Sequence, residues 1–169
     1  PRKGLEDVIE LADIIHKNCL PYTVVVIGSI PEKFSDYSKE LFRRATGLPV
    51  RWVFDRSSRD VSQMLSRSSL AYLPFPDGAS ERRGSLKAAL GNGVVCITTH
   101  GPHTPKALAD VTLFAPTPAK AADMLTGLEA CDRELDVLRA KGRLYMQQFE
   151  WSNIARAHIS TYERILTSR

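Results

Sequence analysis

The feature of this chain that most constrains its fold is a repeated alternation of short β-branched runs with segments of helical periodicity. The β-branched runs favour buried strands and lie at 22–28, 50–54, 70–75, 94–99 and 111–115. The helical segments are expected at 5–18, 35–47, 57–68, 85–90, 104–109, 118–128, 131–149 and 152–167. Short connections in this order predict an α/β fold: a doubly wound, Rossmann-like parallel sheet with helices on both faces.

The length and charge of the chain bound its organisation and its partners. Its 169 residues are enough for one well-cored domain, which we place at 1–169. The chain does not begin with methionine and enters a helix almost at once, so we expect a fragment of a longer protein. A net charge of +4 without a long basic run does not predict nucleic-acid binding, whereas a phosphate-bearing small molecule or an anionic membrane surface fits equally well.

The three cysteines, Cys19, Cys96 and Cys131, lie far apart in the sequence. Because no C-x-x-C occurs, neither a disulfide framework nor a zinc site is predicted. Cys96 stands in the apolar run VVCI and is expected to be a buried, inert thiol. A reducing cytoplasm is the default compartment. No apolar stretch approaches the roughly 18 residues that a membrane span needs.

Ligands of doubly wound parallel sheets bind beyond the carboxyl ends of the strands, so the loops that follow strands are the places to search. Gly28 ends the first strand and would let a ligand approach the backbone closely, although a simple strand-ending turn explains it equally. His100 lies on the loop at 99–105 and is expected to donate a hydrogen bond to a ligand. No carboxylate or cysteine accompanies it, so no metal site is predicted.

The segment PDGASERRGSLKAAL, at 76–90, is the strongest candidate for chemistry. Arg82 and Arg83 stand directly before the expected start of a helix, whose partial positive charge disfavours cations by up to about 1 kcal/mol each. A bound phosphate or diphosphate would reverse that penalty, because an arginine fork and unpartnered first-turn amides both bind anions. These amides belong to Gly84, Ser85 and Leu86. The alternative is a solvated loop without a ligand.

A second basic residue followed by glycine, Lys3–Gly4, precedes the first helix. On its own this is a weak signal, because a terminal lysine is usually solvated. The chain contains no G-x-G-x-x-G fingerprint and no G-x-x-x-x-G-K-[ST] loop, which disfavours a dinucleotide cofactor and a P-loop site. No G-x-S-x-G elbow supports a serine hydrolase.

Several motifs follow one another in an order that covers almost the whole chain: KG before a helix, VVVIG, VRWVF, VSQMLSRSSLAYLPF, SERRGSLKAALGNGVVCITT and FEWSNIARAHISTYERIL. This order resembles the C-terminal half of glycosyltransferase family 4 enzymes, which are retaining enzymes with the GT-B fold. The final F-x-W-x-x-I-A before a terminal helix is quite specific. The loop ERRGS-x-x-AA-x-x-x-G is most similar to a bacterial polysaccharide or O-antigen subgroup.

The resemblance implies a nucleotide-diphosphate sugar as donor, bound in this domain and facing an N-terminal acceptor domain across a cleft. It implies no metal or other cofactor for the diphosphate. Lys3 matches the family lysine that contacts the diphosphate. The family arginine that precedes this lysine stands on a strand that we expect to be absent here, and Arg2 is a partial substitute for it.

The resemblance also assigns roles in the loop at 76–90. The first-turn amides contact the distal phosphate, and Arg82 or Arg83 helps them to stabilise the leaving diphosphate as its charge develops. The predicted catalytic residues are Glu81, Arg82 and Arg83. The predicted substrate-binding residues are Lys3, Gly28, Gly84, Ser85, Leu86 and His100.

One departure from the family pattern concerns the ribose. The family loop reads roughly E-G-F-G-x-x-x-x-E-A-x-A-x-G, and counting back from Gly93 places its second glutamate on Ala88 and its first on Ser80. The second glutamate holds the ribose hydroxyls, a contact that Ala88 cannot make. Glu81 supplies the first, sugar-facing carboxylate if the loop shifts by one residue.

The sequence therefore predicts the donor-binding domain of a retaining glycosyltransferase of bacterial surface glycan synthesis, inactive as a fragment. The expected acceptor is a glycan or a lipid-linked glycan, and the expected location is the cytoplasm or the inner face of the membrane. Two alternatives remain. One is another GT-B enzyme such as a sugar-nucleotide epimerase, and the other is a non-enzymatic Rossmann-like binding domain.

Overall fold

The computed structural model describes residues 3–128 and 132–167. Its strands are β1 (Val24–Gly28), β2 (Val50–Phe54), β3 (Leu70–Leu73), β4 (Val95–Thr98) and β5 (Thr112–Phe114). Every pairing among them is parallel, and the pairs form two groups, β1–β2 and β3–β4–β5. The predicted parallel α/β fold is confirmed.

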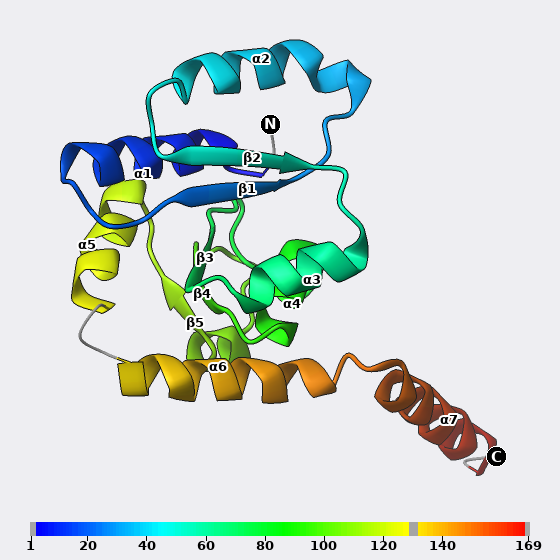
Figure 1. The fold of residues 1–169 in the computed structure, drawn as a ribbon. Coiled ribbons are helices and arrows are strands. Elements are labelled where there is room, and N and C mark those ends of the chain that lie inside the picture. The colour runs from blue at the N-terminus through cyan, green and yellow to red at the C-terminus, as the bar shows by residue number, and fades with distance from the viewer. Residues whose placement is uncertain (1–2, 129–131, 168–169) are drawn as a thin grey trace.

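The helices follow the strands in the predicted order (Figure 1). They are α1 (Leu5–Lys17), α2 (Ser35–Arg44), α3 (Ser58–Ser66), α4 (Gly84–Gly91), α5 (Pro118–Leu128), α6 (Asp132–Gln147) and α7 (Trp151–Thr167). Two 3₁₀ turns, η1 (Glu32–Phe34) and η2 (Lys106–Asp110), complete the set. The helix expected at 104–109 is instead the short 3₁₀ turn η2.

Alternating side chains of the central strand β4 show that the sheet is covered on both faces. Cys96 belongs to a buried cluster that includes α4 residues and is packed by the C-terminal part of α6. Ile97, the next residue, belongs to a second cluster built with α1 and α5. Successive residues of a strand point to opposite faces, so the two clusters are the two sides of one doubly wound layer.

Helix α1 joins the two sheets. Leu11 and Ile15 pack in the cluster beneath β3–β4–β5, whose margin also includes Val24 of β1. Ile9 packs in a third cluster with α2 and β2, where Leu41 is also buried. Because α1 touches both groups of strands, the residues just before it are held in a fixed place relative to the sheet ends.

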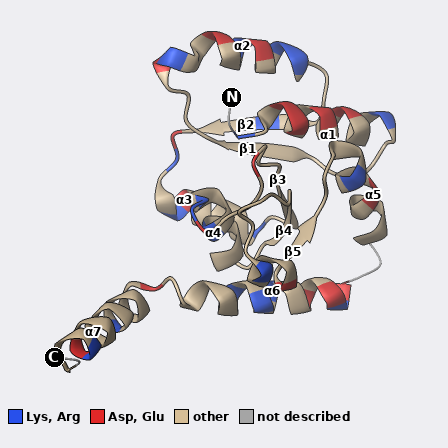
Figure 2. Ribbon diagram, turned by 180° about the vertical axis from the view of Figure 1, so that it is seen from behind, with Lys and Arg blue, Asp and Glu red and all other residues tan. Residues whose placement is uncertain are grey.

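Helix α7 differs from the rest of the chain, because none of its described side chains is buried. It extends away from the body beyond the end of α6, as both ribbon views show (Figures 1 and 2). Trp151 is 84% exposed and Leu166 is 72% exposed.

Figure 2 also shows acidic residues gathered along α1. Within the described residues, no helix combines the length and apolarity that crossing a membrane requires.

Candidate functional site

The loop between β3 and α4 is fixed to the loop after β4 by a pair of facing glycines. Gly78 has a φ of +87°, a conformation that side chains rarely adopt, and a Cβ there would collide with the backbone of Gly101. A Cβ on Gly101 would in turn collide with the carbonyl oxygen of Asp77. Both positions therefore require glycine, and the two loops lie in direct backbone contact.

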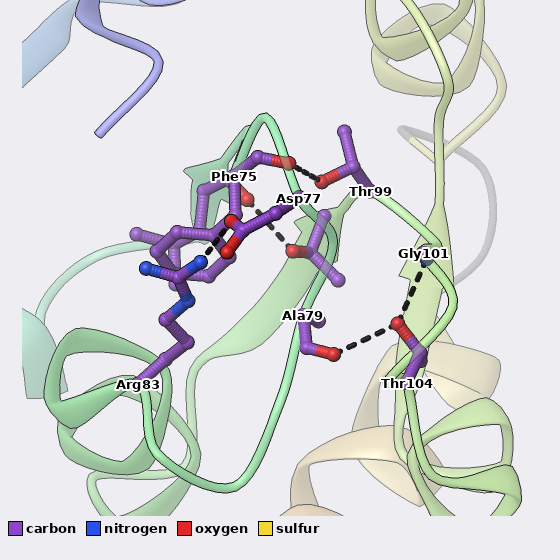
Figure 3. A network of polar contacts seen from close by, with 9 residues as sticks. Phe75, Asp77, Ala79, Arg83, Thr99, Gly101 and Thr104 are labelled. Atoms are coloured by element: carbon purple, nitrogen blue, oxygen red, sulfur yellow. Dashed lines mark hydrogen bonds and ion pairs between the residues drawn. The ribbon is translucent and has the colours of Figure 1, made fainter. Parts of the chain in front are cut away.

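Hydrogen bonds extend this contact (Figure 3). The Ala79 amide donates to the Thr99 carbonyl at 2.8 Å. The Thr104 hydroxyl accepts from the Gly101 amide at 2.9 Å and donates to the Ala79 carbonyl at 2.8 Å. At the strand ends, the Thr98 hydroxyl donates to the Leu73 carbonyl at 2.7 Å. The first part of the β3–α4 loop is thus bonded to the sheet and to its neighbouring loop.

The Lys3–Gly4 pair lies at the same loop. Gly4 is buried, has a φ of +67°, and a Cβ on it would collide with the carbonyl oxygen of Pro74. Since Pro74 follows β3 directly, this contact places the start of α1 against the start of the β3–α4 loop. Lys3, the residue before Gly4, is exposed. Arg2, the partial substitute for the family arginine, lies outside the described residues.

Arg83 has two partners within the protein. Its Nη2 donates to the Asp77 carboxylate, and its guanidinium carbon lies 4.7 Å from the centroid of the Phe75 ring. The Arg83 side chain is 20% exposed, whereas that of Asp77 is 73% exposed. The guanidinium therefore folds back over the loop and links Asp77 to the start of α4, as Figure 3 shows.

The start of α4 is open. Arg83 is the N-cap residue, and no side chain caps the helix. Gly84 and Ser85 are exposed, and no heavy atom lies within 4 Å of a Cβ placed on Gly84. Leu86 anchors the helix because its side chain is 1% exposed in the core. Arg82 is exposed beside these residues, so a flexible cation and unpartnered first-turn amides face solvent together.

Two more charged residues of the segment contact the end of α6 and the turn that follows it. The Tyr145 hydroxyl donates to Glu81 Oε1 at 2.6 Å. Burial and then the hydrogen bond to Glu81 raise the pKa of Tyr145 above its ordinary value. Lys87 Nζ lies 4.1 Å from the centroid of the Phe149 ring. Ala88, at the family's ribose position, is exposed on α4.

The remaining predicted residues lie on neighbouring elements. Gly28 ends β1, accepts from the Asp55 amide at 3.0 Å through its carbonyl, and has open space where a Cβ would be. His100 is exposed on the loop after β4, directly before Gly101, and meets the Phe114 ring edge-on at 5.3 Å. Gly28 belongs to the β1–β2 pair, whereas His100 belongs to the loop that contacts the β3–α4 loop.

The contacts of Asp77 and Tyr145 with this loop are not predictable from the local sequence. Asp77 belongs to a turn-forming Asp–Gly pair and lies six residues before Arg83, a spacing that predicts no particular pairing. Tyr145 is 64 residues from Glu81, and nothing in the local pattern links the two. Two open hollows lie beside α1, one against α5 and one against α2, and neither is lined by residues of the β3–α4 loop. Among the described residues, no three His, Cys, Asp or Glu side chains gather as a metal site.

The sequence matches no family model and no curated protein, but the structure matches solved structures. HepE from Anabaena, solved with UDP, has a TM-score of 0.78 at 16% identity, over 97% of this chain and 46% of HepE. The pneumococcal O-GlcNAc transferase GtfA, solved with UDP and GlcNAc, has a TM-score of 0.73 at 16% identity, over 98% of this chain and 34% of GtfA.

A third match is a domain solved by itself. The C-terminal domain of LpcC from Francisella tularensis, a glycosyl transferase group 1 family protein, has a TM-score of 0.69 at 17% identity, over 89% of this chain and 80% of that domain. The chain thus spans less than half the length of HepE and GtfA, but most of the LpcC domain. Its fold is the Rossmann-like fold of the C-terminal domain of GT-B glycosyltransferases.

Proposed function

We propose that this domain binds a nucleotide-diphosphate sugar and forms the donor-binding half of a retaining glycosyltransferase. The observation that carries the proposal is the open start of α4: an uncapped helix whose first residues are exposed beside Arg82. The fold adds support, because HepE and GtfA were solved with UDP. A helix start of this kind favours a phosphate through both its amides and its partial charge.

The contacts divide the roles among the basic residues. Arg83 is engaged by Asp77 and Phe75, so the proposal gives it the task of shaping the loop. Arg82 is exposed and can turn its guanidinium to the diphosphate, and Lys3 stands beside the same loop because Gly4 packs on Pro74. In the transfer step these cations and the α4 amides stabilise the negative charge that develops on the leaving diphosphate. No metal ion is required in this proposal.

The finer assignments follow the sequence resemblance. The proposal places the enzyme in family 4 and in bacterial surface glycan synthesis. The protein is placed in the cytoplasm or at the inner face of the membrane, with a glycan or lipid-linked acceptor held by an N-terminal domain. Glu81 is proposed as the carboxylate that faces the donor sugar. The ribose has no carboxylate at Ala88, so its contacts are proposed to come from outside α4.

A panel titration tests the proposal. UDP-, GDP-, ADP- and CDP-sugars are added to the protein, and both the melting temperature and the heat of binding are measured. We expect one nucleotide class to raise the melting temperature in a concentration-dependent way, because a ligand that binds only the folded state stabilises it. The corresponding nucleoside diphosphate, without the sugar, should also bind. The nucleoside without phosphates should not bind. A flat response to the whole panel would contradict the proposal.

A further inference from the structure

The proposed phosphate site lies between a contact with the C-terminal part of α6 and a contact with Phe149, in the turn that follows α6. On one side of the segment 82–86, Glu81 accepts a hydrogen bond from Tyr145 at 2.6 Å. On the other side, Lys87 lies over the Phe149 ring at 4.1 Å. The two aromatic rings meet edge-on at 5.7 Å. The end of α6 and the turn after it therefore contact both ends of the segment that carries the open amides.

An uncapped helix start normally attracts the nearest carboxylate. Acidic side chains are favoured there because they accept from the free amides and complement the helix charge. The chain places two carboxylates shortly before Gly84, those of Asp77 and Glu81. Asp77 is held by Arg83, and Glu81 is held by Tyr145. Neither therefore caps α4, which has no side-chain cap.

Tyr145 is well placed to keep Glu81 in this position. Its ring packs against the buried cluster that contains α4 residues. Helices α4 and α6 approach closely, because a Cβ on Gly142 would lie only 3.1 Å from Cδ2 of Leu90. The raised pKa of Tyr145 keeps its hydroxyl protonated, so it remains a donor to the carboxylate. The partner of Glu81 is thus fixed by the core.

We propose that Tyr145 is a positioning residue that holds Glu81 away from the α4 amides and so keeps the site open to a diphosphate. This inference rests on the proposed function. Without the Tyr145 hydroxyl, Glu81 turns toward the start of α4 and competes with the ligand as an internal cap. This competition depends on the negative charge of Glu81. Removing that charge therefore distinguishes the competition from a general loss of packing.

The first experiment measures the affinity for UDP by calorimetry in three variants. Tyr145→Phe keeps the ring and removes only the hydroxyl, and we expect UDP binding to weaken about three- to tenfold. In the double variant Tyr145→Phe/Glu81→Gln, most of the affinity should return, because an uncharged amide competes poorly for the helix start. Tyr162→Phe, at an exposed position of α7, is the matched control and should leave UDP affinity unchanged.

The second experiment needs no nucleotide. Hydrogen exchange of the Gly84, Ser85 and Leu86 amides is followed by NMR in the same variants. In Tyr145→Phe these amides should exchange several-fold more slowly, because Glu81 now accepts from them. In the double variant, their exchange should return to the wild-type rate. A purely structural role for Tyr145 would instead accelerate exchange throughout α4 and α6.

The two readouts separate the inference from the proposed function. If the wild-type protein does not bind UDP while the exchange pattern appears, the nucleotide proposal is wrong and the Tyr145–Glu81 relation stands. If Tyr145→Phe weakens UDP binding and Glu81→Gln fails to restore it, the positioning role is overturned. Unchanged exchange at the three amides in Tyr145→Phe overturns it as well.

Discussion

The β3–α4 loop and the start of α4 form two halves with opposite environments. The fixed half, 74–79, contacts Gly4 on one side and the loop after β4 on the other, largely through backbone atoms. The open half, 80–85, comprises the end of the loop with the exposed Arg82 and the first two residues of the uncapped helix α4. Arg83 links the halves through its contact with Asp77. A rigid base that presents free amides pre-organises an anion site, since little further ordering is needed when the ligand binds.

The largest expected difference between the halves comes from one substitution made in each. Gly78→Ala should lower the free energy of unfolding by about 2 kcal/mol or more, because of the positive φ and the collision with Gly101. Gly84→Ala, in the open half, meets no atom and should be neutral or stabilising by up to about 1 kcal/mol. Urea unfolding measures both. Equal losses would show that the halves do not differ.

The next effect tests the side-chain bonds of the fixed half. Thr104→Val removes a hydroxyl that serves both the Gly101 amide and the Ala79 carbonyl, so it should lower stability by about 1–3 kcal/mol. Thr161→Val, on exposed α7, is the control and should change stability by less than about 0.5 kcal/mol. Urea unfolding of both variants measures the difference. If the two variants lose the same free energy of unfolding, the hydrogen bonds between the loops contribute little to stability.

The two arginines provide the sharpest contrast. Arg83→Ala should lower the free energy of unfolding by about 1 kcal/mol, because a partly exposed ion pair and a cation–π contact are lost. Arg82→Ala should leave stability within about 0.5 kcal/mol but weaken UDP binding about tenfold. The control is Arg133→Ala, an exposed residue at the start of α6. If Arg82→Ala and Arg133→Ala have equal effects on UDP affinity, Arg82 is not a ligand.

The smallest expected effect concerns the strand beneath the fixed half. Burial raises the pKa of the Cys96 thiol to about 12, so the thiol stays protonated and unreactive at pH 8. In a Cys131→Ser background, a thiol reagent should label exposed Cys19 quickly and leave Cys96 unlabelled. Mass spectrometry identifies which cysteine is labelled. Fast labelling of Cys96 would mean that the base of the loop opens readily.

The sequence predicted the fold well, because β-branched runs and helical periodicity are local signals that tertiary packing reinforces in this chain. The start of α4 was also predictable, since Gly84 and Ser85 lie before an apolar helical stretch. The different environments of Arg82, which is exposed, and Arg83, which contacts Asp77 and Phe75, were not predictable. They depend on the path of the loop, which the contact between Gly78 and Gly101 sets, and that contact joins segments more than twenty residues apart. The contact between Tyr145 and Glu81 was not predicted either, because these residues are 64 positions apart in the sequence.

The most direct test of the central claim is an NMR titration of the ¹⁵N-labelled protein with UDP. The account predicts that the amides of Gly84, Ser85 and Leu86 shift most, that the shifts saturate with UDP concentration, and that uridine without phosphates leaves them unchanged. Shifts confined to the hollows beside α1, or equal shifts with uridine, would contradict the claim that the start of α4 holds the diphosphate.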